Sequence, residues 1–332
     1  MKPRTEALIE RLRAGDRIAL AKLMTLVESR DPETPQVVSA LRRSTQSAPI
    51  IGITGPPGAG KSTLLDRLVG SFRASGRKIG IVAVDPSSPF SGGAVLGDRI
   101  RMQSHFLDDG VFIRSLSARG SVGGLARAAR DMTRLLDAFG KDMIIVETVG
   151  VGQSEFDIMR LAETVVVVLV PEAGDTIQAM KAGLLEVADI FVVNKADREG
   201  AQRIQSDLDA MLQLRPVGEG WTVPVLPTVA TEGKGVTELV EAIERHRQYL
   251  HASGEGASRA AAARRDEFIA ILREELGRRL EQSLRHGRPA EALARVENGD
   301  SDPYEAVLEL LSDDRSVGAA LLRPEEREVP SK

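Results

Sequence analysis

The chain has 332 residues with a formal net charge of −4, and 42% of its residues are hydrophobic but only 3% are aromatic. This composition predicts a large aliphatic core and excludes the strongly basic face that nucleic-acid binding requires. The sequence has no cysteine, which rules out disulfides, thiolate metal sites and cysteine nucleophiles. No apolar signal core follows Met1, and the densest apolar run, Val165 to Val170, is far shorter than the ~20 residues of a membrane helix. We therefore expect a soluble, cytoplasmic protein with neither nucleic-acid nor membrane partners.

Residues 1–45 are predicted to form short helices, an N-terminal helical extension. Their apolar side chains recur with the i, i+3, i+4 spacing of one helix face. Three such faces can be read: Leu8, Ile9 and Leu12; Leu20, Leu23 and Met24; and Val37, Val38 and Leu41.

From residue 50 the pattern changes to short β-branched runs that alternate with helical stretches. Continuous apolar strands separated by helices indicate a mostly parallel sheet covered on both faces. The predicted strands are Ile50–Thr54, Ile79–Val84, Val111–Ile113, Met143–Val146, Thr164–Val170, Ile190–Val193 and Val223–Leu226. We therefore predict an α/β domain of about seven strands over residues 46–250, with ligands at the carboxyl ends of the strands.

The first predicted strand leads into a phosphate-binding loop. Residues 55–62 match G-x-x-x-x-G-K-S, and the apolar face of a helix follows them, as a P-loop NTPase requires. The glycines let backbone N–H groups surround phosphate oxygens at a helix N-terminus. Lys61 is expected to reach the β- and γ-phosphates, and Ser62 to place its hydroxyl on Mg²⁺. The predicted nucleotide-binding residues are Gly55, Pro56, Pro57, Gly58, Ala59, Gly60, Lys61, Ser62 and Thr63.

Acidic residues end two of the predicted strands or follow them. Asp85 ends the strand Ile79–Val84, and Asp98 lies in the glycine-rich segment 91–99, where a nucleotide-sensing switch is expected. An ordinary loop carboxylate is an equally weighted interpretation of Asp98. Glu147 ends the strand Met143–Val146, and in this order after a phosphate loop it is expected to hold Mg²⁺, directly or through water. Gly150 follows, and its N–H is expected to meet a γ-phosphate.

The segment from Pro171 to Gly183 follows the buried strand Thr164–Val170 and is much more polar. One interpretation is a helix start, capped by Asp175, with its apolar side chains facing the core. The other is a movable segment with a hinge at Gly174. We expect both to hold, with the helix beginning inside the movable segment.

A guanine-reading motif ends the strand Ile190–Val193. Asn194, Lys195 and Asp197 form N-K-x-D, in which the Asp197 carboxylate accepts from the N1–H and the 2-amino group of guanine. Adenine would leave that carboxylate unpaired, at a cost of about 1–3 kcal/mol. The stem of Lys195 is expected to lie along the purine. After the next strand, a backbone N–H of Thr228, Val229 or Ala230 is expected to reach the guanine O6.

Residues 257–332 are predicted to be helical, after a linker at 253–256. Asp302 and Pro303 mark one helix start, as cap and first residue. A long apolar stripe recurs every fourth residue at Phe268, Leu272, Leu276, Leu280 and Leu284. Such a stripe needs a partner surface, either the chain's own domain or a second copy. The sharper prediction is a dimerisation arm in a homodimer.

Three segments together resemble the MeaB/ArgK-type G proteins: residues 55–62, the string E-T-V-G-V-G-Q-S-E at 147–155, and N-K-A-D at 194–197. These proteins are GTPase chaperones of adenosylcobalamin-dependent methylmalonyl-CoA mutase. The resemblance covers about residues 45–245 by motif, and residues 85–89, 97–102 and 174–181 also match the family pattern. Val229 stands where the family usually has serine, but the guanine contact there is expected from the backbone.

The resemblance implies GTP and GDP as ligands, Mg²⁺ as cofactor and an adenosylcobalamin-dependent acyl-CoA mutase as partner. It implies that Asp85, Asp98 and Glu147 surround Mg²⁺. It also implies a loop that passes the nucleotide state to the mutase, and its members are Asp175, Gln178 and Lys181. Since only Gln153 is a candidate for positioning water and no arginine finger is evident, we expect slow hydrolysis that a partner accelerates.

The sequence also bears on three other functions. A metal-insertion GTPase needs metal ligands, but the four histidines have no ligand-like spacing and there is no cysteine. A kinase linked to amino-acid transport needs a phosphoacceptor site, and none is visible. A GTPase with another partner stays open, because fold and motif do not fix function. The sequence favours a GTP hydrolase that gates cofactor loading and protection of a mutase, and it leaves open which acyl-CoA mutase that is.

Overall fold

The computed structural model describes residues 1–41, 48–85, 103–105, 107–117, 122–148, 150, 159–173, 187–214, 220–285 and 287–312. The chain divides into two compact units, Met1–Arg259 and Ala260–Lys332. The first unit contains a seven-stranded parallel sheet, which confirms the predicted P-loop α/β fold class. In the described part of the chain, no helix is both long enough and apolar enough to cross a membrane.

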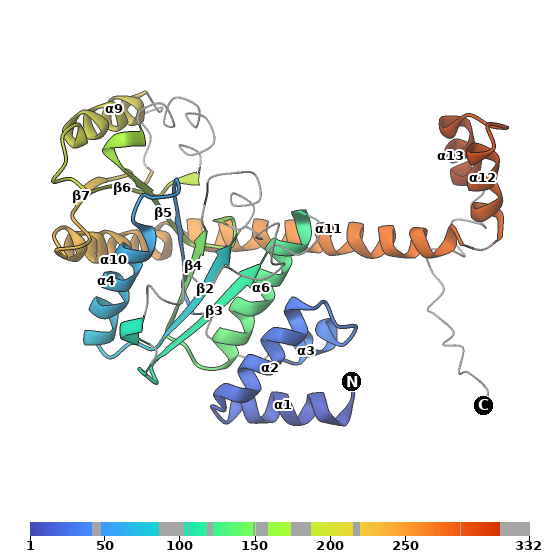
Figure 1. Cartoon of the computed structure of the whole chain (residues 1–332), viewed down its shortest axis with the longest axis horizontal. Coiled ribbons are helices and arrows are strands. Elements are labelled where there is room, and N and C mark those ends of the chain that lie inside the picture. Colours follow the sequence, from blue (N-terminus) through green and yellow to red (C-terminus); the bar gives the residue numbers. More distant parts are fainter. Residues whose placement is uncertain are drawn as a thin grey trace. The chain divides into compact units, whose positions relative to one another are not determined.

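The sheet has the strand order β3-β2-β4-β1-β5-β6-β7 (Figure 1). The strands are β1 (Ile50–Thr54), β2 (Ile79–Asp85), β3 (Val111–Ser117), β4 (Met143–Thr148), β5 (Thr164–Leu169), β6 (Ile190–Asn194) and β7 (Val225–Thr228). Five strands, β2, β3, β4, β6 and β7, end later than their apolar runs predict. The ladder between β2 and β3 continues to Asp85 and Ser117, and the ladder between β2 and β4 continues to Thr148. Backbone pairing therefore carries polar residues into the carboxyl edge of the sheet.

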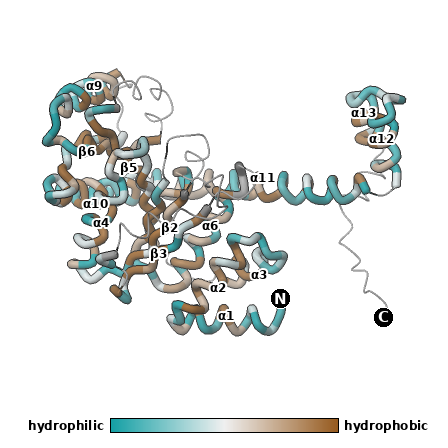
Figure 2. Tube along the Cα trace, viewed as in Figure 1, coloured by the Kyte–Doolittle hydropathy of each residue, from teal (hydrophilic) through white to brown (hydrophobic). Residues whose placement is uncertain are grey.

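Both faces of the sheet are buried. Successive side chains of a strand point to opposite faces, so each strand contributes to two apolar clusters. In β5, Val165 and Val167 belong to one apolar cluster and Val166 and Val168 to the other. Helices α4 (Lys61–Ala74) and α10 (Val236–Ser253) pack on one face, and α6 (Val122–Ala138) and α9 (Ala201–Gln213) on the other. Figure 2 shows the resulting hydrophobic strands between helices with more hydrophilic outer surfaces.

The N-terminal helices join the same unit as the sheet. They are α1 (Pro3–Arg13), α2 (Arg17–Glu28) and α3 (Thr34–Leu41), and α2 and α3 pack against α6. Arg17 donates to the carbonyls of Asp109 and Val111, at 3.0 and 2.9 Å, at the start of the edge strand β3. Glu28 forms an ion pair with Arg114 of the same strand at 2.5 Å. These contacts attach α2 to the edge of the sheet.

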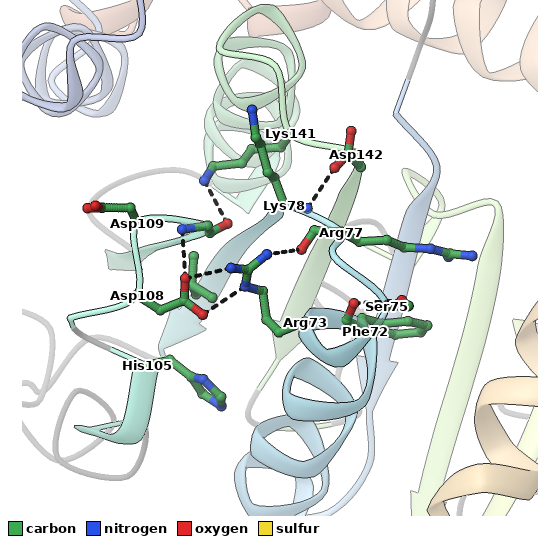
Figure 3. A network of polar contacts seen from close by, with 12 residues as sticks. Phe72, Arg73, Ser75, Arg77, Lys78, His105, Asp108, Asp109, Lys141 and Asp142 are labelled. Carbon is green, nitrogen blue, oxygen red and sulfur yellow. Dashed lines mark hydrogen bonds and ion pairs between the residues drawn. The ribbon is translucent and has the colours of Figure 1, made fainter.

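Figure 3 shows a polar network that lies at the amino ends of β2, β3 and β4. Arg73 of α4 donates to both carboxylate oxygens of Asp108, at 2.7 and 2.8 Å. Lys141 is only 4% exposed, and its Nζ donates to the carbonyl of Gly110 at 2.9 Å. Burial, with a further contribution from the charge of Arg17, lowers the pKa of Lys141 from 10.5 to about 8.

The linker predicted at 253–256 is wrong, because only Gly254 separates the two helices. Helix α10 ends at Ser253, Gly254 takes a left-handed conformation with φ of 74°, and α11 (Glu255–Ser283) begins at once. The early start has a physical reason, because Glu255 accepts a hydrogen bond from Tyr249 and Arg259 forms an ion pair with Asp189 at 3.0 Å. The first turn of α11 is thus fixed to the unit that contains the sheet.

The second unit contains the rest of α11 followed by α12 (Gly287–Glu297) and α13 (Pro303–Ser312). Asp302 caps α13 as predicted, accepting from the N–H groups of Tyr304 and Glu305 at 2.8 and 3.3 Å. An ion pair between Arg295 and Glu309, at 2.6 Å, joins α12 to α13.

Candidate nucleotide site

The phosphate loop lies between β1 and α4 and passes very close to the ends of β5 and β6. Gly55 has a φ of 146°, and a Cβ there would lie 2.0 Å from the carbonyl oxygen of Val168. Gly60 has a φ of 84°, and a Cβ there would lie 2.4 Å from Nδ2 of Asn194. Both positions therefore require glycine, and the two glycines allow the loop to lie directly against the neighbouring strand ends.

Lys61 is the first residue of α4 and is only 6% exposed. Its Nζ donates to the carbonyls of Gly55 and Pro56, at 2.8 and 2.9 Å. The ammonium group therefore lies over the phosphate loop, beside the positive end of the 14-residue helix α4. This is the environment in which an anionic phosphate group is stabilised.

Ser62 and Glu147 form the centre of the candidate metal site. The Ser62 hydroxyl donates to Oε1 of Glu147 at 2.8 Å, and the two residues are 8% and 4% exposed. Two buried oxygen donors beside a phosphate loop fit Mg²⁺, which takes oxygen ligands and often uses only one or two from the protein. Asp85 is the last residue of β2, the strand next to β4. Asp98 lies outside the described residues.

Two threonines that the sequence analysis did not select lie next to this pair. Thr148 Oγ1 donates to Thr54 Oγ1 at 2.8 Å, and Thr54 Oγ1 donates to the carbonyl of Gly150 at 2.7 Å. Thr54 is 1% exposed and Thr148 is fully buried. The sequence could have indicated these two threonines, because hydroxyl residues at the ends of neighbouring buried strands need hydrogen-bond partners.

Asn194 connects the phosphate loop to the segment after β7. Its side chain, on the last residue of β6, is 2% exposed. Its Nδ2 donates to the carbonyl of Ala59 at 2.8 Å. Its Oδ1 accepts from Thr228 Oγ1 and from the N–H of Ala230, at 3.0 and 3.1 Å. The first residue of the guanine motif thus joins three segments of the chain.

The residues after Asn194 form a tight turn. Lys195 has a φ of 57°, which is uncommon for a residue other than glycine. The turn is fixed by the N–H of Ala196, which donates to the carbonyl of Thr228 at 3.0 Å. As a result Lys195 is half-buried and Asp197 is exposed. The turn therefore leaves the Asp197 carboxylate accessible to a ligand.

Lys234 also lies near this turn, and the sequence analysis did not select it. The N–H of Val229 donates to the carbonyl of Lys234 at 3.0 Å, and this bridge brings Lys234 back beside the strand end. Its ammonium group lies 2.6 Å from Glu232. The pKa of Lys234 is raised, chiefly by Glu232 and to a smaller extent by the charge of Asp197.

Comparison with known proteins agrees with this assembly of motifs. Residues 20–284 match the family described as methylmalonyl-CoA mutase-associated GTPase MeaB. The chain belongs to the MeaB family. The resemblance drawn from the sequence motifs is therefore confirmed.

Relatives of this MeaB-family chain are found in all three domains of life. A protein of Pyrococcus horikoshii named as a GTPase is 50% identical over 309 residues, which cover 92% of this chain and 96% of the relative. GTPase ArgK of Escherichia coli is 38% identical over 275 residues, 80% of this chain and 82% of ArgK. The mitochondrial methylmalonic aciduria type A homolog of Mus musculus is 38% identical over 263 residues, 74% of this chain and 63% of the homolog.

Among solved structures, this MeaB-family chain is similar to one described as LAO/AO transport system kinase. The two share 29% sequence identity with a TM-score of 0.67, and the match covers 95% of this chain and 99% of the other. The two chains therefore have similar folds.

The structure brings most of the predicted site residues of this MeaB-family chain to one edge of the sheet. The phosphate loop, Ser62, Glu147 and the Asn194 turn lie together, and Thr228 to Ala230 contact Asn194. Asp175, Gln178 and Lys181, like Asp98 and Gln153, lie outside the described residues. The roles given to all these residues stay predictions.

Proposed function

We propose that this protein hydrolyses GTP and acts as a chaperone of an adenosylcobalamin-dependent acyl-CoA mutase, with methylmalonyl-CoA mutase as the first candidate. The observation that carries the proposal is the side chain of Asn194, which joins the phosphate loop to the guanine-reading segment. The description of the MeaB family and the name of the Mus musculus homolog support the mutase as partner.

The phosphate end of GTP would bind at the loop between β1 and α4. Lys61 would exchange the carbonyls of Gly55 and Pro56 for phosphate oxygens, and the N–H of Gly150 would meet the γ-phosphate. Ser62 and Glu147 would hold Mg²⁺, with Asp85 and Asp98 contributing from the neighbouring strand and loop. When bound, Mg²⁺ supplies positive charge to the β- and γ-phosphate oxygens.

The base of GTP would be read at the turn after β6. The exposed Asp197 carboxylate would accept from the N1–H and 2-amino groups, and the stem of Lys195 would cover the purine. Backbone N–H groups of Thr228, Val229 or Ala230 would reach the O6. The N–H of Ala230 already donates to Asn194 and that of Val229 to Lys234, so a ligand bound by either group would share or replace that bond.

The oligomeric part of the proposal is a homodimer formed through residues 257–332. Phe268, Leu272 and Leu280 of α11 are 66%, 45% and 50% exposed, and no described residue of α11 is buried. An apolar stripe of this length is typical of a surface that another chain covers. We also propose that residues 46–250 are the GTP-binding domain, with residues 1–45 as its helical extension, and that the protein is cytoplasmic.

The coupling to the mutase is proposed to run through the loop that contains Asp175, Gln178 and Lys181. The experiment is to measure GTP turnover alone and with methylmalonyl-CoA mutase, with isobutyryl-CoA mutase as a second candidate partner. We expect one mutase to accelerate turnover and to co-elute with the protein. Gln178→Ala and Lys181→Ala should keep GTP affinity within about a few-fold but lose most of the acceleration, because a residue that only couples leaves ground-state affinity unchanged.

The outcomes separate the two parts of the proposal. GTP turnover without acceleration or co-elution by any cobalamin-dependent mutase would contradict the chaperone function and leave the GTPase. Full acceleration of both loop variants would contradict the role of the loop only. Absence of GTP turnover in every condition would contradict the proposal as a whole.

A further inference from the structure

Two buried threonines connect the last residue of β1 to the chain beyond β4. The bonds run from Thr148 Oγ1 to Thr54 Oγ1, at 2.8 Å, and from Thr54 Oγ1 to the carbonyl of Gly150, at 2.7 Å. A hydroxyl has one proton to donate, so each threonine uses its proton in this chain of bonds. Gly150 provides the final acceptor. The two threonines are buried and Gly150 is partly buried, and a relay of this kind fixes its members because an unmade bond of a buried hydroxyl is costly.

The place of the relay in the sheet suggests its role. β1 and β4 are parallel neighbours, with Ile53 opposite Glu147, so Thr54 and Thr148 follow this pair at the carboxyl edge. Gly55, the first residue of the phosphate loop, comes directly after Thr54. The Thr54 hydroxyl therefore holds the backbone of Gly150 beside the start of the phosphate loop.

We propose that Thr54 is a positioning residue for the γ-phosphate of GTP. It fixes the backbone at Gly150, whose N–H is the proposed partner of that phosphate. Glycine has more backbone freedom than any other residue, so its orientation depends on such an anchor. GDP lacks the γ-phosphate and gains nothing from the anchored residue. The inference rests on the proposed GTPase function and deepens it, since the relay then contributes to the preference for GTP over GDP.

The test uses Thr54→Val, which replaces the hydroxyl with a methyl group and removes the donor to Gly150. The quantity measured is the dissociation constant of GDP divided by that of a non-hydrolysable GTP analogue, from displacement of a fluorescent nucleotide. We expect this ratio to fall by about 2- to 10-fold, the effect of one hydrogen bond, while GDP affinity changes by less than about twofold. Thr54→Ser keeps the hydroxyl and should restore the ratio to within about twofold of wild type.

Two further variants complete the design. Thr148→Val removes the donor to Thr54 and a longer contact, 3.4 Å, to the carbonyl of Gly150, and it should lower the ratio in the same direction by about twofold. Thr133→Val is the matched control, because Thr133 is 3% exposed and donates to the carbonyl of Arg130 at 2.7 Å within α6. Its ratio should equal that of wild type. Thermal unfolding without nucleotide shows which variants are folded.

A folded Thr54→Val protein with the wild-type ratio, or a higher one, would overturn the inference. If Thr54→Val does not fold, Thr54→Ala, which also lacks the hydroxyl, decides by the same criterion. A fall that Thr54→Ser does not reverse would also overturn it, because the effect would then come from packing and not from the hydroxyl. A wild-type protein that binds neither nucleotide would overturn the proposed function itself, so the two failures are distinguishable.

Discussion

Replacing Asn194 with alanine should destabilise the protein even when no nucleotide is present. The variant loses the hydrogen bond to Ala59, at 2.8 Å, and those from Thr228 and Ala230, at 3.0 and 3.1 Å. Each such bond contributes about 0.5–1.5 kcal/mol net, so the loss of three amounts to about 2–4 kcal/mol of unfolding free energy. The three former partners share one site, and their effects are therefore not strictly additive.

The assay for this prediction is equilibrium unfolding in urea, followed by the fluorescence of Trp221, the only tryptophan in the chain. The midpoint of the Asn194→Ala transition should fall while its slope stays unchanged. The matched comparison is Asp197→Ala in the same motif, because Asp197 is exposed and its loss should change stability by less than about 0.5 kcal/mol. Equal stability of the two variants would refute the structural role of Asn194.

Three more predictions address the base, the arm and the buried lysine. Asp197→Asn should lower the affinity for GTP at least about 5-fold and favour XTP, because the asparagine amide can donate to the 2-oxo group of xanthine. Competition binding measures this selectivity. Unchanged selectivity would mean that other residues recognise the base. Leu276→Glu combined with Leu280→Glu should give monomers that still bind GTP, as measured by light scattering. The control is Ala260→Glu, because Ala260 is exposed and lies on the opposite face of α11 from these leucines. A monomeric wild type would contradict the prediction. Lys141→Met should remove a rise in unfolding free energy between about pH 8 and 10.5. Because the pKa of Lys141 is lowered in the folded state, the unfolded chain binds more protons in this range. The cost of burying the charged lysine is therefore present below about pH 8 and disappears as the pH rises. The same pH dependence of the unfolding free energy in wild type and Lys141→Met would contradict this.

The sequence predicts the fold well wherever side-chain pattern determines the backbone. The β-branched runs place all seven strands, because strands buried on both faces must be apolar throughout. Strand ends are predicted less well, since the ladder that extends β2 to Asp85 depends on pairing with residues far along the chain. The same limit explains β7, which begins at Val225 and not at Val223.

The candidate site shows a similar division. Motifs with fixed local spacing, such as the phosphate loop and N-K-x-D, can be read directly from the sequence. The contacts that hold these motifs together, such as Thr54 to Gly150, join residues 96 positions apart. The early start of α11 likewise depends on the ion pair of Arg259 with Asp189, at a separation of 70 positions. No local pattern encodes such distant pairs, and only the folded chain reveals them.

The attachment of α2 to β3 has a practical consequence for shortened forms of this protein. β3 is the outermost strand of the sheet, and Arg17 occupies the carbonyls of Asp109 and Val111 near its start. Exposed strand edges pair readily with other chains. A fragment cut at residue 46, where the nucleotide motifs suggest a natural beginning, would lose that cover and also expose the apolar face of α6. Expression of the nucleotide-binding region for crystallisation should therefore retain the first helices, or the fragment will self-associate.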